Sequence, residues 1–195
     1  MAILETTIGL TLRGYTCLEL RPVLPVTPET VYTYNVRLWV HDRLVYDRIQ
    51  SVRHLQMRHY HVEMIAHALC NPRAYLGTRI QFSADPELVP QADSFPYSVA
   101  AVHLETDWLT MVIYATENKR VGEAVAANIY LRNSEMTYGD IEKTSQGKWG
   151  RFEELVWAMV ICRPDDSIAF GQQLRAEIRE AERQRVELRI PESDD

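Results

Sequence analysis

Apolar and polar residues alternate regularly from position 31 to position 40, and this pattern predicts a β-strand. Tyr34 and Leu38 are among the residues expected to face a core, while the residues between them face the other side of the sheet. His41 and Asp42 follow, and we expect them to turn the chain into a second strand. The region therefore predicts a half-exposed hairpin.

Looser alternation predicts further strands on both sides of this hairpin. An opening hairpin is expected around Gly14, and three prolines make residues 22–28 a stiff connector. Residues 124–131 fit a strand or a helix, and we favour a strand. The other strands are expected at residues 78–83, 99–105, 108–115 and 155–162.

Spacings of three and four residues predict a helix at about residues 51–70. Ser51 is expected to cap its start, because a serine hydroxyl accepts hydrogen bonds from free backbone amides. Pro72 is expected to end it, because the residue before a proline leaves the helical region. The residues expected along its packed stripe are Val52, Leu55, His59, Val62, Ala66 and Leu69.

A C-terminal helix is expected at about residues 165–188. Asp165 and Asp166 follow a proline, where acidic side chains complement the positive end of a helix dipole. Its apolar stripe consists of Phe170, Leu174, Ile178 and Ala181.

Together these patterns predict an α+β fold, in which a largely antiparallel sheet has one helix (about 51–70) packed on it and a C-terminal helix follows. We expect a single globular domain at residues 1–190 and a short acidic tail at residues 191–195.

Composition narrows the function classes only slightly. The chain has 195 residues, of which 46% are hydrophobic and 25% are charged, as is typical of one globular domain. The formal net charge of −6 argues against a generally basic surface that coats nucleic acid, although a local basic patch is compatible with it.

The cysteines indicate the compartment. Cys17, Cys70 and Cys162 are widely spaced and form no CxxC pair, which favours a reducing, intracellular location in the cytoplasm or nucleus. The sequence contains no apolar run long enough for a transmembrane segment, so we expect none.

A basic stretch is the first candidate binding site. Arginines outnumber acidic residues between positions 37 and 61 by five to two, a local charge of +3. An arginine next to a tryptophan on one strand face can hold phosphates or stack on bases, whereas regularly spaced arginines can also form an ordinary solvated face. The candidates for binding an anion or nucleic acid are Arg37, Trp39, Arg43, Arg48, Arg53 and Arg58.

A histidine-rich stripe is a candidate metal site. His59, Glu63 and His67 are four residues apart, so a helix would place them on one face, as in known i,i+4 metal sites. The spacing differs from HExxH, in which the glutamate lies beside the first ligand. In the other interpretation, His59 is a hydrogen-bonded core residue, and Glu63 and His67 form an exposed pair.

The loop at residues 85–96 is a candidate for self-association. It contains three prolines and few hydrophobic residues, and exposed loops of this kind often dock into a neighbouring copy. The same side chains could equally fold back onto the body of the protein. The candidate contact residues are Leu88, Val89, Phe95 and Tyr97.

The sequence gives little support for catalysis. It contains neither a GxSxG motif nor a glycine-rich phosphate loop, so we expect a protein that is not an enzyme and needs no cofactor.

Several short blocks, in order along the chain, resemble the matrix proteins of rhabdoviruses. They cover about a quarter of the sequence and lie at residues 34–40, 46–64, 73–76, 109–114 and 152–162. The resemblance implies a small α+β protein of the virion that polymerises through loop-to-neighbour contacts. It also implies that the protein bridges a nucleocapsid and an envelope without a catalytic step. Its expected partners are itself, a nucleoprotein or other anionic partner, and a membrane surface contacted from the side.

The preferred hypothesis is thus a non-enzymatic, self-associating structural protein of the viral matrix type. The alternatives are a metal-dependent enzyme or metal-binding domain and a monomeric inhibitor or adaptor. The sequence does not identify the partner, and it leaves open whether the arginines form one surface.

Overall fold

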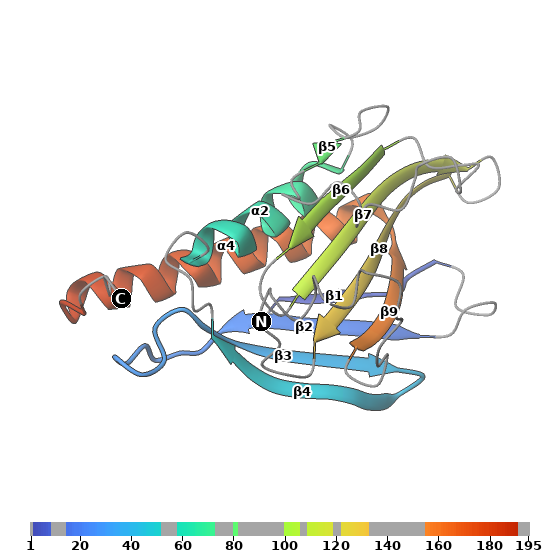
Figure 1. Ribbon diagram of the computed structural model, residues 1–195. Coiled ribbons are helices and arrows are strands. Elements are labelled where there is room, and N and C mark those ends of the chain that lie inside the picture. Colours follow the sequence, from blue (N-terminus) through green and yellow to red (C-terminus); the bar gives the residue numbers. More distant parts are fainter. Residues whose placement is uncertain are drawn as a thin grey trace, which may run out of the picture.

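The structure is a computed structural model that describes residues 2–8, 15–51, 58–72, 80–81, 100–105, 109–118, 122–132 and 155–190. These residues form a four-stranded sheet, a five-stranded sheet and two helices (Figure 1). The predicted α+β fold with a C-terminal helix is therefore confirmed, with two sheets where the sequence predicted one.

The four-stranded sheet is antiparallel throughout and has the order β1-β2-β3-β4. Its strands are β1 (Ile3–Glu5), β2 (Thr16–Pro22), β3 (Thr33–Val40) and β4 (Arg43–Ser51). Tyr34, Val36 and Leu38 on β3 are fully buried, as the alternation predicted. His41 and Asp42 both have positive φ angles, 50° and 62°, which suit a two-residue hairpin turn.

The five-stranded sheet has the order β5-β6-β7-β8-β9 and is antiparallel except for the short β5–β6 pair. Its strands are β5 (Ile80–Gln81), β6 (Ala100–Glu105), β7 (Leu109–Asn118), β8 (Gly122–Arg132) and β9 (Leu155–Cys162). The segment at residues 124–131, for which the sequence favoured a strand over a helix, lies within β8.

The described helices are α2 (Arg58–Cys70) and α4 (Pro164–Glu187). The predicted helix start at Ser51 is wrong, because Ser51 is the last residue of β4 and pairs with Thr33. The pairing of β4 with β3 extends to this residue and overrides its capping tendency. Val62, Ala66 and Leu69 are buried, so the predicted stripe is correct over the described part of α2.

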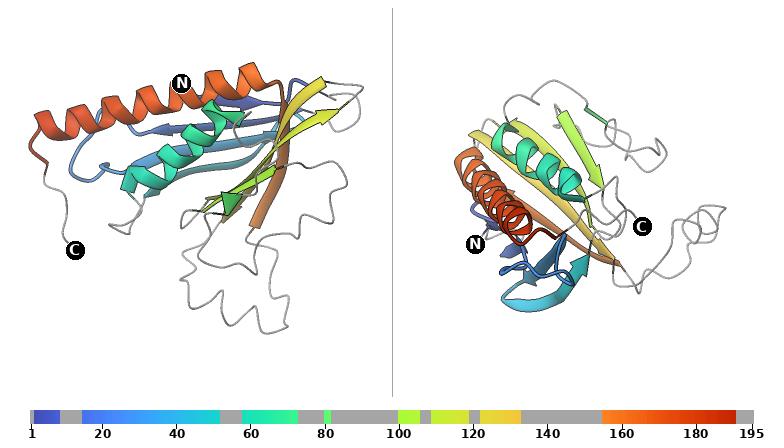
Figure 2. Two further views of the ribbon diagram at one scale, coloured as in Figure 1. Left: turned by 90° about the horizontal axis from the view of Figure 1, so that it is seen from above. Right: turned by 90° about the vertical axis from the view of Figure 1, so that its left-hand side faces the viewer.

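Both sheets and both helices contribute to one core. α4 contacts β1, β2 and β8, while α2 lies beside α4 and contacts β6 and β7 (Figure 2). The sheets meet where the chain after β1 reaches β9: the backbone amide of Thr7 donates to the carbonyl of Ile161 at 2.9 Å. One continuous cluster of buried side chains joins these elements. The predicted acidic tail at residues 191–195 lies outside the described residues.

Gly171 allows α4 to approach α2 closely. A Cβ atom at this position would lie 2.5 Å from the backbone oxygen of Ala66 and 2.8 Å from both the backbone nitrogen and the Sγ atom of Cys70. Backbone atoms cannot move aside without shifting the helix, so a larger residue at this position would separate α4 from α2.

We therefore expect Gly171→Ala to lower the free energy of unfolding by about 1–3 kcal/mol, although alanine has the higher helix propensity. Urea denaturation of the purified protein measures this change. The matched control is Gln172→Ala at the exposed neighbouring position, which should change stability by less than about 0.5 kcal/mol. A stabilised Gly171→Ala variant would show that the helix contact is looser than described.

Candidate functional site

The outer face of the four-stranded sheet, turned away from the core, carries Arg37 and Trp39, as predicted. Residues directly opposite each other on antiparallel strands point to the same face, so Glu19 of β2 and Asp47 of β4 flank Arg37. Arg37 Nε donates a hydrogen bond to Asp47 Oδ1 at 3.1 Å, and its Nη1 lies 3.7 Å from Glu19 Oε2. This hydrogen bond and the charge of Asp47 raise the pKa of Arg37.

Glu19 extends this arrangement into a charged row across the sheet. Its side chain is only 4% exposed, and its Oε1 lies 3.3 Å from Nε of Arg21. The row Arg21, Glu19, Arg37 and Asp47 thus alternates in sign and contains two cations and two anions. Arg37 already has two carboxylate neighbours, so this row presents no excess positive charge to an anion.

The described arginine candidates do not share one face. Arg48 lies opposite Val36 and Arg43 lies opposite Val40, so both belong to the face opposite to that of Arg37. Both side chains are exposed. The sequence left open whether the arginines form one surface, and the strand register divides these three between two faces.

The three remaining candidates are Arg58, Arg53 and Trp39. Arg58 is the first residue of α2, and Arg53 lies outside the described residues. Trp39 is half-buried between its cross-strand neighbours Cys17 and Leu44.

His59 packs into the junction of β3, α2 and α4. The Tyr34 hydroxyl forms a hydrogen bond with Nδ1 of His59. The imidazole meets the rings of Tyr32 and Tyr34 edge-on, with centroid separations of 4.9 Å and 5.8 Å. His59 therefore matches the second interpretation of the histidine stripe, in which it is a hydrogen-bonded core residue.

Burial lowers the pKa of His59 to about 4. Two residues of α4 act in opposite directions: the carboxylate of Glu182 favours the charged imidazole and Arg185 disfavours it. These two residues are themselves paired at 2.6 Å, so their effects partly cancel and burial dominates. His59 is neutral at pH 7.

The histidine stripe is not assembled for metal binding. Glu63 and His67 are exposed on α2, whereas Nδ1 of His59 is engaged by Tyr34. In the part of the chain that the structure describes, no group of three or more His, Cys, Asp or Glu side chains could hold a metal ion.

The predicted self-association residues Leu88, Val89, Phe95 and Tyr97 lie outside the described residues.

The edge of β4 is a candidate contact site that the sequence analysis missed. Within the described strands β4 pairs only with β3, and it exposes Leu44, Val45 and Ile49, the last of these by 68%. The β3–β4 register shifts between Leu38 and Trp39, which leaves Val45 without a partner on β3. The sequence predicts a strand here, but its place at the edge of a sheet depends on strand order, which a single sequence does not show.

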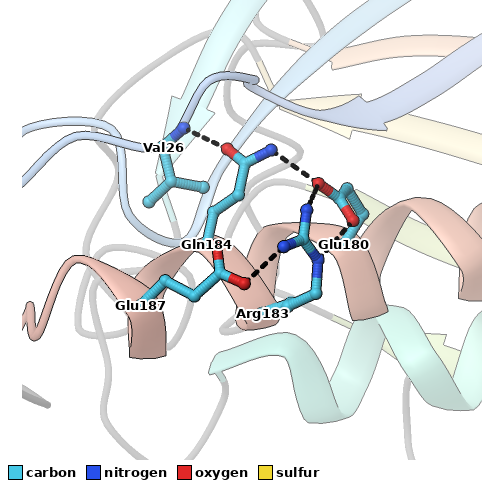
Figure 3. Close-up of polar contacts among 5 residues, drawn as sticks. All are labelled: Val26, Glu180, Arg183, Gln184 and Glu187. Carbon is cyan, nitrogen blue, oxygen red and sulfur yellow. Dashed lines mark hydrogen bonds and ion pairs between the residues drawn. The ribbon is translucent and has the colours of Figure 1, made fainter.

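The second half of α4 holds the connector between β2 and β3. Gln184 Oε1 accepts a hydrogen bond from the backbone amide of Val26 at 3.0 Å (Figure 3). Around it, Arg183 pairs with Glu180 and Glu187 along the exposed helix face, at spacings of three and four residues. These exposed pairs are mutually compensated and form no open charged site.

The charged row predicts a specific loss of stability. Arg37→Met should lower the free energy of unfolding by about 1–3 kcal/mol, because the buried carboxylate of Glu19 loses one of its two cationic neighbours. Arg43→Met, at an exposed position on β4, is the matched control and should change stability by less than about 0.5 kcal/mol. Equal urea midpoints for the two variants would contradict the role assigned to the row.

His59 predicts a pH dependence of stability. Between pH 6.5 and about 4 the unfolded chain binds a proton at this residue and the folded chain does not. Acidification in this window therefore favours unfolding, by at most about 1.4 kcal/mol per pH unit from this one residue. Urea denaturation at several pH values should show a shallower slope for His59→Leu than for the unsubstituted chain.

The control for this experiment is His67→Leu, which removes an exposed histidine from the same helix. The slope should fall more in His59→Leu than in this control, because His59 is the buried histidine of the two. If His59→Leu kept the full slope, His59 would not be the residue that resists protonation.

No helix among the described residues is both long and apolar enough to cross a membrane. Comparison of the chain with known proteins found no matching family and no matching curated protein.

Proposed function

We propose that this chain is a non-enzymatic structural protein that self-associates, of the viral matrix type. The observation that carries the proposal is the exposed apolar edge of β4. Leu44, Val45 and Ile49 are exposed on a nine-residue strand that has one described neighbour. A long edge with apolar side chains is a template for pairing with another chain.

The family resemblance supports the same class of protein. The block at residues 34–40 forms most of β3, the block at 109–114 lies in β7, the middle strand of its sheet, and β9 contains most of the block at 152–162. The resemblance likens the first two blocks to an early strand and a central sheet strand of the family, and the last block to a late passage from helix to strand. On this basis the protein bridges an anionic nucleocapsid and an envelope, which it contacts from the side.

The first test is the mass of the purified chain across concentration. We expect multi-angle light scattering to show a rise from the monomer mass of 22.6 kDa to at least twice that value as the concentration increases to the high micromolar range. Association at interfaces of this kind follows mass action. A constant monomer mass up to millimolar concentration would refute self-association.

The matrix-type assignment is tested in the same preparation with anionic phosphatidylserine vesicles. The associated protein should sediment with these vesicles more than with neutral phosphatidylcholine vesicles, and high salt should reduce the difference. Association without any preference for anionic vesicles would leave a self-associating protein and remove its envelope-bridging role.

A further inference from the structure

We infer that two copies of the chain pair antiparallel through their β4 edges, joining two four-stranded sheets into one sheet of eight strands. The inference rests on the self-association proposed above and specifies the surface that carries it. One side of β4 is occupied by β3, and no described strand pairs with its other side.

Symmetry restricts how two identical strands can pair. An antiparallel pair of identical strands is related by a twofold axis perpendicular to the sheet, so the outer face of one copy continues as the outer face of the other. The register that overlaps both strands completely places Arg43 opposite Ser51 of the second copy. Asp47, the middle residue of β4, then lies on the axis.

In this register, exposed apolar side chains of the two β4 strands lie opposite each other. Val45 lies opposite Ile49 of the second copy, so two exposed apolar side chains cover each other, and the symmetry repeats this pair. On the other face Tyr46 is buried in the core of its own copy, so the contact depends on the outer face. A second copy is therefore the occupant that the pattern of β4 favours, since one sequence supplies both halves of each pair.

The negative charge of Asp47 should limit the affinity of the two copies for each other. The two copies of Asp47 face each other at the axis, and each is paired with Arg37 of its own chain at 3.1 Å. Like charges directly opposite each other on neighbouring strands weaken pairing. Added salt screens this repulsion, so association through β4 should become tighter as salt increases.

The closing experiment compares two lysine substitutions at similarly exposed aliphatic residues. Ile49→Lys places a charge in the β4 pair twice per dimer, whereas Val186→Lys changes a residue of α4 that is 59% exposed. By sedimentation equilibrium we expect Ile49→Lys to raise the dimer dissociation constant at least tenfold and Val186→Lys to change it less than twofold. Thermal unfolding of each variant checks that it is folded.

The outcomes separate the two proposals. If the unsubstituted chain associates and Ile49→Lys associates as strongly as Val186→Lys, β4 pairing is refuted while self-association stands. If the unsubstituted chain stays monomeric at every concentration, the proposed function itself fails.

A substitution at Asp47 tests the register of the β4–β4 pair. Asp47→Asn removes the like charges at the axis, and its Oδ1 atom can still accept the hydrogen bond from Arg37. We expect this variant to dimerise about two- to fivefold more tightly than the unsubstituted chain at low salt and to lose most of the salt dependence. Equal or weaker association of Asp47→Asn would refute the register centred on this residue.

A measurement on the unsubstituted chain covers the case in which Ile49→Lys does not fold. Hydrogen–deuterium exchange at low and high concentration should show slower exchange in peptides that span residues 43–51 when the protein is concentrated. Concentration-dependent protection confined to other peptides would refute pairing through β4.

Discussion

The first turn of α4 is the constraint on which the rest of the structure depends. Thr7 Oγ1 donates to Asp166 Oδ2 at 2.7 Å and accepts from the backbone amide of Arg163 at 3.1 Å, which ties the segment after β1 to the helix start. The buried hydroxyl of Ser167 donates to the carbonyl of Leu69 at 2.8 Å, near the end of α2. One helical turn thus joins the edges of both sheets to the second helix. The buried stripe of α4 then completes the core.

This arrangement determines which surfaces remain for partners. The inner faces of both sheets are buried, so β2 and β3 can offer a partner only their outer face. That face is electrically balanced by the row from Arg21 to Asp47, and the balance depends on register, because Glu19 and Asp47 lie directly opposite Arg37. What remains distinctive is the edge of β4, where apolar side chains and backbone groups are exposed together.

Local pattern predicted much of the fold and little of the site. The burial of Tyr34 and the buried stripe of α2 follow from periods of two and of three to four residues, which a sequence displays directly. The start of α2 was placed wrongly because the capping tendency of Ser51 competes with strand pairing to Thr33, a contact 18 positions away. The division of the arginines between two faces and the pairing of Arg37 with Glu19 are likewise set by pairing between strands. A single sequence does not show such pairing.

The register of the β3–β4 pair also determines which charges lie near the proposed contact between two copies. Arg43 and Arg48 lie on the face opposite to Arg37, and in one copy they are two exposed cations in a chain with a net charge of −6. Pairing through β4 would bring the corresponding arginines of a second copy onto the same face, with Arg48 one residue from the axis in each chain. The outer face contributes Asp47 at the axis, where it is paired with Arg37 of its own chain. The apolar pair of Val45 and Ile49 would therefore supply most of the attraction between the copies, and the two Asp47 carboxylates would set its salt dependence.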